Sequence, residues 1–88
     1  MHPTAQVPAF RVQIGATGHR STWLPVATFA AASFACRTFI EANDLGASRW
    51  RGGRIIDAAT EEVVATVSYN GRVWLADGSE SLQAFQAT

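Results

Sequence analysis

The dipeptide Asn70-Gly71 constrains the fold of this chain most strongly, because it lies between two runs of strand-forming residues. The runs are VVATVSY (63–69) and RVWLA (72–76), whose valines and aromatic residues favour β-structure. Asn-Gly suits a two-residue hairpin turn that needs positive φ at both of its central residues. The sequence therefore predicts two antiparallel strands in which Tyr69 faces Arg72, Val67 faces Trp74 and Ala65 faces Ala76.

This pairing also predicts which side chains share a face of the hairpin, because side chains alternate along a strand. One face would carry Val63, Ala65, Val67, Tyr69, Arg72, Trp74 and Ala76, and the other Val64, Thr66, Ser68, Val73 and Leu75. Both faces hold apolar residues, so two interpretations remain. In the first, Val67 and Trp74 pack under a helix, with Tyr69 and Arg72 at the rim. In the second, Tyr69, Arg72 and Trp74 form an open patch of the residue types that most often anchor protein interfaces.

The hydrophobic period changes along the first half of the chain. Phe10, Val12 and Ile14 alternate with polar residues, which indicates a half-buried strand. Residues 21–26 are extended or irregular around a proline. From residue 28 to 44 the apolar residues recur at helical spacing, and Thr28 can cap the helix N-terminus. The face expected to be buried holds Phe29, Ala32, Ser33, Cys36, Phe39 and Ile40.

Gly46 follows the helix at the position expected for a left-handed C-terminal cap. Residues 48–58 then predict a second strand, weakened or bulged at Gly52-Gly53, before the hairpin supplies the third and fourth. Strand, helix and three strands joined by short turns predict an α+β fold, an antiparallel sheet with one helix packed on one face. We expect a single domain over residues 1–88, with 1–8 as a flexible lead-in and 78–88 as a short helical turn or tail.

The composition argues against several classes of function. Seven arginines, with no lysine, balance seven acidic residues, so no global field draws the chain to nucleic acid or to a membrane surface. Neither a signal peptide nor a run long enough to span a bilayer is evident. The single cysteine excludes an intrachain disulfide and fits a reducing compartment, so we expect a cytoplasmic protein.

No catalytic residue, metal site or cofactor is predicted. His2, His19 and Cys36 lack the spacing of metal ligands, and Cys36 belongs to the apolar side of the helix. The glycines of GATGH and RGGR match neither a phosphate loop nor a dinucleotide fingerprint. The sequence favours a protein that is not an enzyme.

Two charged segments are further candidates for contacts with a partner. Arg49, Trp50, Arg51 and Arg54 of RWRGGR could hold phosphates and stack a base, or could form a solvated strand edge that discourages aggregation. The acidic residues Asp57, Glu61 and Glu62 of the next turn could pair with a basic groove or serve solubility alone.

The order of elements, FRVQI, then FAAASFACRTFIEA, then VATVSYNGRVW, covers residues 10 to 76. It resembles that of small proteins of phages and other mobile elements, among them some anti-CRISPR proteins. The resemblance implies a non-enzymatic inhibitor that binds a CRISPR surveillance complex and blocks access of target DNA or recruitment of a nuclease. Because the chain is neutral, unlike the strongly acidic members that mimic DNA, a specific protein–protein contact is favoured.

We therefore expect a small interaction protein, monomer or homodimer, whose contacts come from Tyr69, Arg72 and Trp74, with the RWRGGR segment or the acidic turn contributing. Two alternatives remain. One is a nucleic-acid-binding accessory protein that uses RWRGGR, and the other is a small domain that dimerises through its open sheet face.

Overall fold

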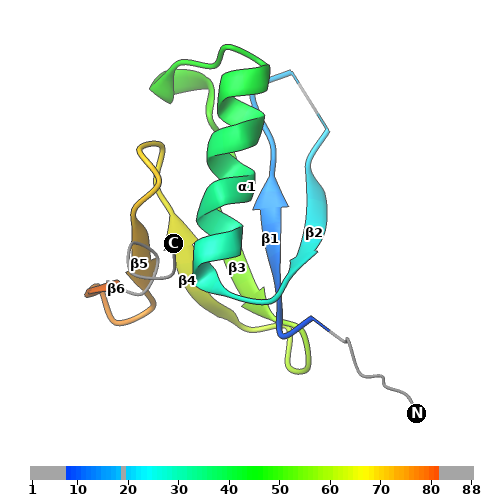
Figure 1. Cartoon of the computed structure of the whole chain (residues 1–88), viewed down its shortest axis with the longest axis vertical. Coiled ribbons are helices and arrows are strands. Elements are labelled where there is room, and N and C mark those ends of the chain that lie inside the picture. The colour runs from blue at the N-terminus through cyan, green and yellow to red at the C-terminus, as the bar shows by residue number, and fades with distance from the viewer. Residues whose placement is uncertain (1–7, 19, 82–88) are drawn as a thin grey trace.

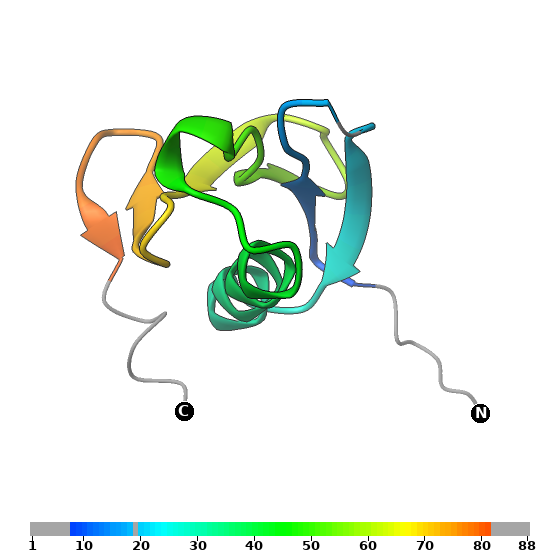
Figure 2. The same ribbon diagram turned by 90° about the horizontal axis from the view of Figure 1, so that it is seen from above.

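Six antiparallel strands form one sheet in the computed structural model of the chain, which describes residues 8–18 and 20–81. Their bounds are β1 Phe10–Ile14, β2 Thr22–Val26, β3 Arg54–Asp57, β4 Val63–Val67, β5 Val73–Leu75 and β6 Glu80–Ser81. The spatial order is β2-β1-β3-β4-β5-β6, so β2 and β6 are the edges. The helix α1 (Phe29–Ala42) lies across one face of the sheet and leaves the other without a helix (Figures 1 and 2). The predicted α+β class is confirmed, with one strand more at each edge.

The helix begins where its cap predicts. Thr28 has extended backbone angles, and its hydroxyl oxygen accepts a hydrogen bond from the amide of Ala31 at 3.0 Å. The helix buries Ala32, Cys36 and Ile40 against the sheet, with Phe29 and Phe39 packed beside them, as the periodicity predicts.

The helix ends earlier than the position of Gly46 suggests. Asp44, with φ of 52°, adopts the left-handed conformation. The amide of Leu45 then donates to the carbonyl of Ile40 at 3.0 Å, and the amide of Asp44 to that of Glu41 at 3.3 Å. These two bonds form a Schellman motif, in which an aspartate can replace the usual glycine. The prediction that Gly46 is the left-handed C-terminal cap was therefore wrong. Asp44 takes that position, and the buried side chain of Leu45 follows it.

The predicted second strand, 48–58, forms only from Arg54 onward. Residues Ala47–Arg49 make a 3₁₀ turn, η1, and Trp50 bridges to Ala16 of the chain that continues β1. Gly53 has φ of 106°, and its amide and carbonyl bond to Gln13 and Val67 at 2.7 Å each. A Cβ atom on Gly53 would overlap the Val67 carbonyl oxygen, so only glycine lets the segment that leads into β3 approach β4 here. The weakening predicted at Gly52-Gly53 is confirmed.

The hairpin forms where predicted, but its register differs by one residue. Ala65 pairs with Leu75, Thr66 with Trp74 and Val67 with Val73. The loop holds three residues rather than two, since the Ser68 amide donates to the Arg72 carbonyl at 2.8 Å. Gly71 has positive φ (92°) whereas Asn70 does not, as in a type I turn followed by a bulge. The predicted pairing of Val67 with Trp74 is therefore wrong, and so is the division of faces derived from it.

Both additional strands come from segments without a clear sequence pattern. Within residues 21–26, Thr22–Val26 form the edge strand β2, where Pro25 is tolerated because an edge strand needs fewer backbone donors. Glu80 and Ser81 pair with Trp74 and Val73, so the helical turn or tail expected from residue 78 is wrong at those two positions. Residues 82–88, and 1–7 of the predicted lead-in, lie outside the described residues.

Candidate functional site

The sheet face opposite α1 is covered by no other helix or strand of the described residues (Figure 2). Val12, Ile55, Val67 and Val73 point toward α1 and are buried, so their neighbours along each strand point the other way. We call this surface the open face. It is formed by Arg11, Gln13, Trp23, Pro25, Arg54, Ile56, Val63, Thr66, Arg72, Trp74 and Glu80.

Two tryptophans lie on the open face and remain partly in solvent. Trp23 on β2 is 42% exposed and Trp74 on β5 is 37% exposed. Arg54 pairs with Thr66, and Thr66 with Trp74, so these three side chains form one row across β3, β4 and β5. Counted along the sheet, which curves around α1 (Figure 2), four strand spacings of about 4.8 Å separate the strands of the two tryptophans, about 19 Å in all. The face thus carries an aromatic side chain toward each side and an arginine between them.

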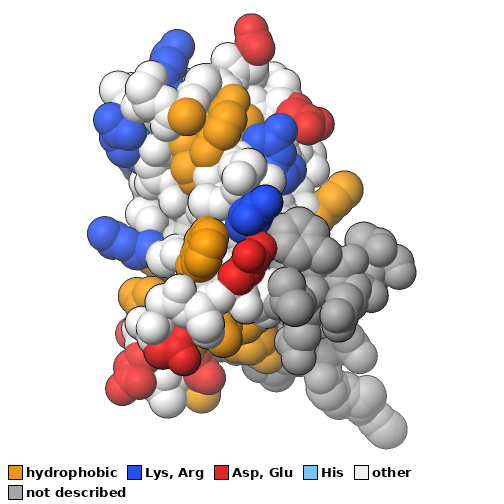
Figure 3. Space-filling view, turned by 90° about the vertical axis from the view of Figure 1, so that its left-hand side faces the viewer, with side chains coloured by type: hydrophobic (Ala, Val, Ile, Leu, Met, Phe, Trp, Pro, Cys, Tyr) orange, Lys and Arg blue, Asp and Glu red, His pale blue; other side chains and the backbone are white. Residues whose placement is uncertain are grey.

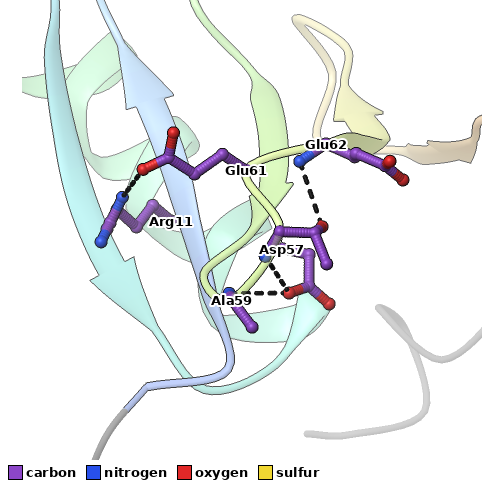
Figure 4. Close-up of polar contacts among 6 residues, drawn as sticks. Arg11, Asp57, Ala59, Glu61 and Glu62 are labelled. Carbon is purple, nitrogen blue, oxygen red and sulfur yellow. Dashed lines mark hydrogen bonds and ion pairs between the residues drawn. The ribbon is translucent and has the colours of Figure 1, made fainter.

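A shallow groove lies between Trp23 and Val63 on this face. It is lined by Arg11, Trp23, Arg54, Ile56, Glu61 and Val63. Arg11 forms an ion pair with Glu61 at its rim (Figure 4), with 3.8 Å between the nearest nitrogen and oxygen. Both side chains are well exposed, so this pair is weak and easily exchanged. Arg54 is exposed, and its guanidinium has no hydrogen-bond or ion-pair partner among the described residues.

The acidic turn after β3 is partly structural. One carboxylate oxygen of Asp57 accepts hydrogen bonds from the amides of Ala59 at 2.8 Å and Thr60 at 3.1 Å, so Asp57 closes the turn (Figure 4). Glu61 has φ of 65° and donates its amide to the Asp57 carbonyl at 2.7 Å. The side chains of Glu61 and Glu62 are exposed. Of the three predicted acidic contacts, Glu61 and Glu62 remain accessible, and only Glu61 lines the groove.

Within RWRGGR, the structure separates the aromatic residue from the arginines. Trp50 is only 9% exposed, and its ring centroid lies 6.2 Å from that of Phe39 in the core. Trp50 follows η1 and bridges to Ala16, and its side chain lies on the inner side of the chain, opposite to those of Arg49 and Arg51. Arg49 and Arg51 are exposed, and Arg51 donates to the Trp50 carbonyl at 3.1 Å. Trp50 is therefore not available to stack a base.

The predicted trio of Tyr69, Arg72 and Trp74 is also divided. The Tyr69 hydroxyl donates to the Leu45 carbonyl at 2.8 Å, and Arg37 of α1 lies over its ring at 5.4 Å from the centroid. Tyr69 thus belongs to the helix side of the sheet. Arg72 and Trp74 lie on the open face, where Arg72 pairs with Glu80 at 3.8 Å. The two side chains lie on different sides because the loop has three residues, so Tyr69 and Arg72 do not face each other across the hairpin.

Four of the residues that line the groove were not among the predicted contacts: Arg11, Trp23, Ile56 and Val63. The sequence does not predict the position of Trp23, because residues 21–26 show no alternation of apolar and polar residues and are expected only to be extended or irregular. Its position follows only from the pairing of β2 with β1, in which Trp23 faces Gln13. The period-2 pattern of FRVQI does place Arg11 on the solvent side of its strand, and that signal could have identified it.

Charge is unevenly distributed around the molecule. Figure 3, which faces the β5–β6 side, shows arginine side chains along the upper part of the left margin and acidic side chains at its lower end. Along the chain, Arg49 and Arg51 precede β3 and Arg54 begins it, whereas Asp57 ends it and Glu61 and Glu62 follow. The division is local to this margin, because acidic side chains also lie at the top of the same view (Figure 3).

A second apolar surface lies on the helix side, between α1 and β2. The groove is lined by Ile14, Leu24, Phe34, Ala35, Thr38, Phe39, Ala42 and Asn43. Phe34 is 74% exposed and Leu24 41% exposed. No charged side chain lines this groove. It therefore offers a partner apolar contact area but no charged group that would fix the partner's orientation.

The described residues contain no group of three or more His, Cys, Asp or Glu that could hold a metal ion. Burial raises the pKa of the Cys36 thiol to about 12, so this residue is protonated at neutral pH and packs as a small apolar side chain. Among the described helices, none combines the length and apolar character needed to cross a bilayer. The chain matches no family model, no curated protein and no solved structure, so its function is inferred from its own residues.

Proposed function

We propose that this chain is a small, non-enzymatic binding domain that docks onto a partner protein through its open face. The observation that carries the proposal is the pair of exposed tryptophans, Trp23 and Trp74, with Arg54 between them on an uncovered sheet. Tryptophan and arginine are the residue types whose truncation most often removes binding energy from protein interfaces. A rigid sheet also holds these side chains in place before binding, which limits the entropy lost on association.

The charge of the face favours a protein partner over nucleic acid. Three arginines, Arg11, Arg54 and Arg72, lie near two glutamates, Glu61 and Glu80, which leaves an excess of one positive charge. Binding to nucleic acid depends on several simultaneous phosphate contacts. The RWRGGR segment also lacks an exposed aromatic residue, since Trp50 is in the core.

The architectural resemblance to anti-CRISPR proteins names the class of partner to test first, a CRISPR surveillance complex in the cytoplasm. A domain docked on such a complex would inhibit it by covering the path of the target DNA or the surface that recruits a nuclease. This mode of inhibition requires only binding, which suits a chain without a proposed catalytic group.

The test is a plasmid-interference assay in bacteria with an active CRISPR system, combined with binding of the purified chain to the surveillance complex. We expect the wild-type chain to protect the plasmid and to co-elute with the complex. Trp23→Ser and Trp74→Ser should each weaken both effects by tenfold or more, about the effect of losing an interface anchor. The matched control is Phe34→Ser, which removes an exposed aromatic from the helix side and should have no effect.

Two results would contradict the proposal. Absence of binding to every surveillance complex tried would exclude this class of partner. Binding that survives both tryptophan changes but is lost in Phe34→Ser would move the site to the groove between α1 and β2.

A further inference from the structure

We infer that the groove on the open face recognises a carboxylate, so that the partner presents an aspartate or glutamate, flanked by apolar residues, to Arg54. This inference rests on the proposed function and specifies the chemistry that a partner must carry. It depends on the position of Arg54, on its lack of a partner and on the apolar side chains around it.

Arg54 occupies a central place on the open face. It is the first residue of β3, which has two strands on one side and three on the other. In the groove it lies among Trp23, Ile56 and Val63, all apolar. Arg11, Arg37 and Arg72 each have a carboxylate oxygen at 3.3 to 3.8 Å, whereas Arg54 has none among the described residues.

Docking would change the surroundings of Arg54 more than those of the other arginines. In the free chain, water solvates its exposed guanidinium. A partner that covers Trp23 and Val63 would remove that water, and a buried charge without a counter-charge strongly opposes binding. Glu61 lines the same groove but pairs with Arg11, so an acceptor from the partner would compensate the charge of Arg54 without breaking that pair. A carboxylate suits the planar guanidinium best, because it can accept two parallel hydrogen bonds.

The surroundings favour a single carboxylate over a chain of phosphates. Glu61 stands at the rim of the groove, and Glu80 lies at the far side of the face. Both would repel a polyanion that crossed the sheet, since it carries a charge at every nucleotide. One acidic side chain directed at Arg54 carries a single charge, so it meets less of this repulsion than a polyanion that crosses the whole face. The apolar walls then contact the apolar residues on either side of it in the partner.

The inference can be tested without a known partner, by selecting short random peptides displayed on phage against the immobilised full chain. We expect the enriched peptides to share an aspartate or glutamate with aromatic or aliphatic neighbours. Synthetic copies should bind Arg54→Gln at least about tenfold more weakly, as expected for the loss of one partner of a covered charge pair. Arg49→Gln, which removes an exposed arginine outside the groove, is the matched control and should bind as wild type does.

A double-mutant cycle isolates the contact itself. Changing the shared acidic residue of the peptide to its amide should weaken binding to the wild-type chain as much as Arg54→Gln does. The same peptide change should then have little further effect on Arg54→Gln, because both changes remove one interaction. Independent, additive losses would overturn the inference.

The remaining outcomes separate the inference from the proposed function. Peptides that lose affinity for Trp74→Ser but bind Arg54→Gln normally would overturn the carboxylate contact and leave the open face as the site. Peptides insensitive to Trp23→Ser, Trp74→Ser and Arg54→Gln would contradict both. Oligo(dT) that binds more tightly than any peptide and depends on Arg54 would show that the groove takes phosphate instead.

Discussion

Burial changes the acidity of the Cys36 thiol and with it the reactivity of this residue. Its side chain is fully buried beneath α1, which raises the pKa of the thiol to about 12. Because the thiolate is the reactive species, we expect iodoacetamide to leave the native chain unmodified at about pH 8.5 and to alkylate it completely in denaturant. Mass spectrometry of both samples measures this. Rapid alkylation of the native chain would show that the thiol is accessible.

The same pKa predicts how stability depends on alkaline pH. The folded-state pKa is raised above its ordinary value of 9.0, so the buried thiol contributes its full stability below pH 9. That contribution is lost progressively between pH 9 and about 12, because the unfolded chain releases the proton first. Urea unfolding of wild type and Cys36→Ala across this range isolates the thiol from other titrating groups. Parallel pH profiles for the two chains would contradict the shift.

Gly53 and Gly78 allow backbone strain to be separated from a steric clash. Both have positive φ, 106° and 94°. A Cβ atom on Gly53 would overlap the carbonyl of Val67, whereas a Cβ atom on Gly78 would meet no described atom within 4 Å. We expect Gly78→Ala to lower the free energy of unfolding by about 1 kcal/mol, from φ alone. Gly53→Ala should cost about 2 to 5 kcal/mol, because the clash adds to the strain. Equal costs in urea unfolding would contradict the close approach of β3 and β4.

At the scale of elements, the hairpin loop is tied to the helix. Ser33 donates to the Gly71 carbonyl at 2.6 Å, and Arg37 donates to the Tyr69 carbonyl at 2.6 Å. Gly71 itself is buried beside these two side chains. The contacts hold the loop over α1, and the loop in turn sets the register of β4 and β5. The register is thus a property of the packing of the hairpin on the helix.

Because Tyr69 lies on the helix side and Arg72 on the open face, changing each should affect the stability of the fold differently. Tyr69→Phe removes the hydrogen bond to the Leu45 carbonyl, so we expect about 1 kcal/mol less stability. Its effect on partner binding should be small, because the hydroxyl faces the helix side. Arg72→Gln breaks only a long ion pair whose arginine is exposed, and should change stability by less than about 0.5 kcal/mol. Thermal or urea unfolding compares the two, and the opposite ranking would place Tyr69 on the open face.

The whole molecule owes little of its stability to charge. The three ion pairs among residues 8–18 and 20–81 span 3.3 to 3.8 Å and involve mostly exposed side chains. Such pairs contribute little and are screened by salt. We therefore expect the free energy of unfolding to change by less than about 1 kcal/mol when sodium chloride rises to about 1 M. A marked loss of stability in salt would mean that the ion pairs stabilise the fold more than their geometry indicates.

The helix and the existence of the hairpin could be predicted because their signals are local. Thr28 caps the helix three residues away, and the helical spacing of Ala32, Cys36 and Ile40 selects its buried side. The candidate site was predicted less well. Of the predicted contacts, Arg54, Arg72 and Trp74 lie on the open face and Glu61 lines its groove, whereas Trp50 faces the core and Tyr69 faces the helix.

The sequence by itself determined the α+β class, the helix with its N-cap, and the presence of a turn at Asn70-Gly71. These features depend on interactions within a few residues and on the periods of helix and strand. Only the tertiary structure decided the register of the hairpin, the inward turn of Trp50 and the place of Trp23 on the open face. Each of these depends on contacts between residues distant in the chain: Ser33 with Gly71, Ala16 with Trp50, and Gln13 with Trp23. A one-residue shift moves a strand's side chains to the opposite face, so long-range packing chose the surface available to a partner.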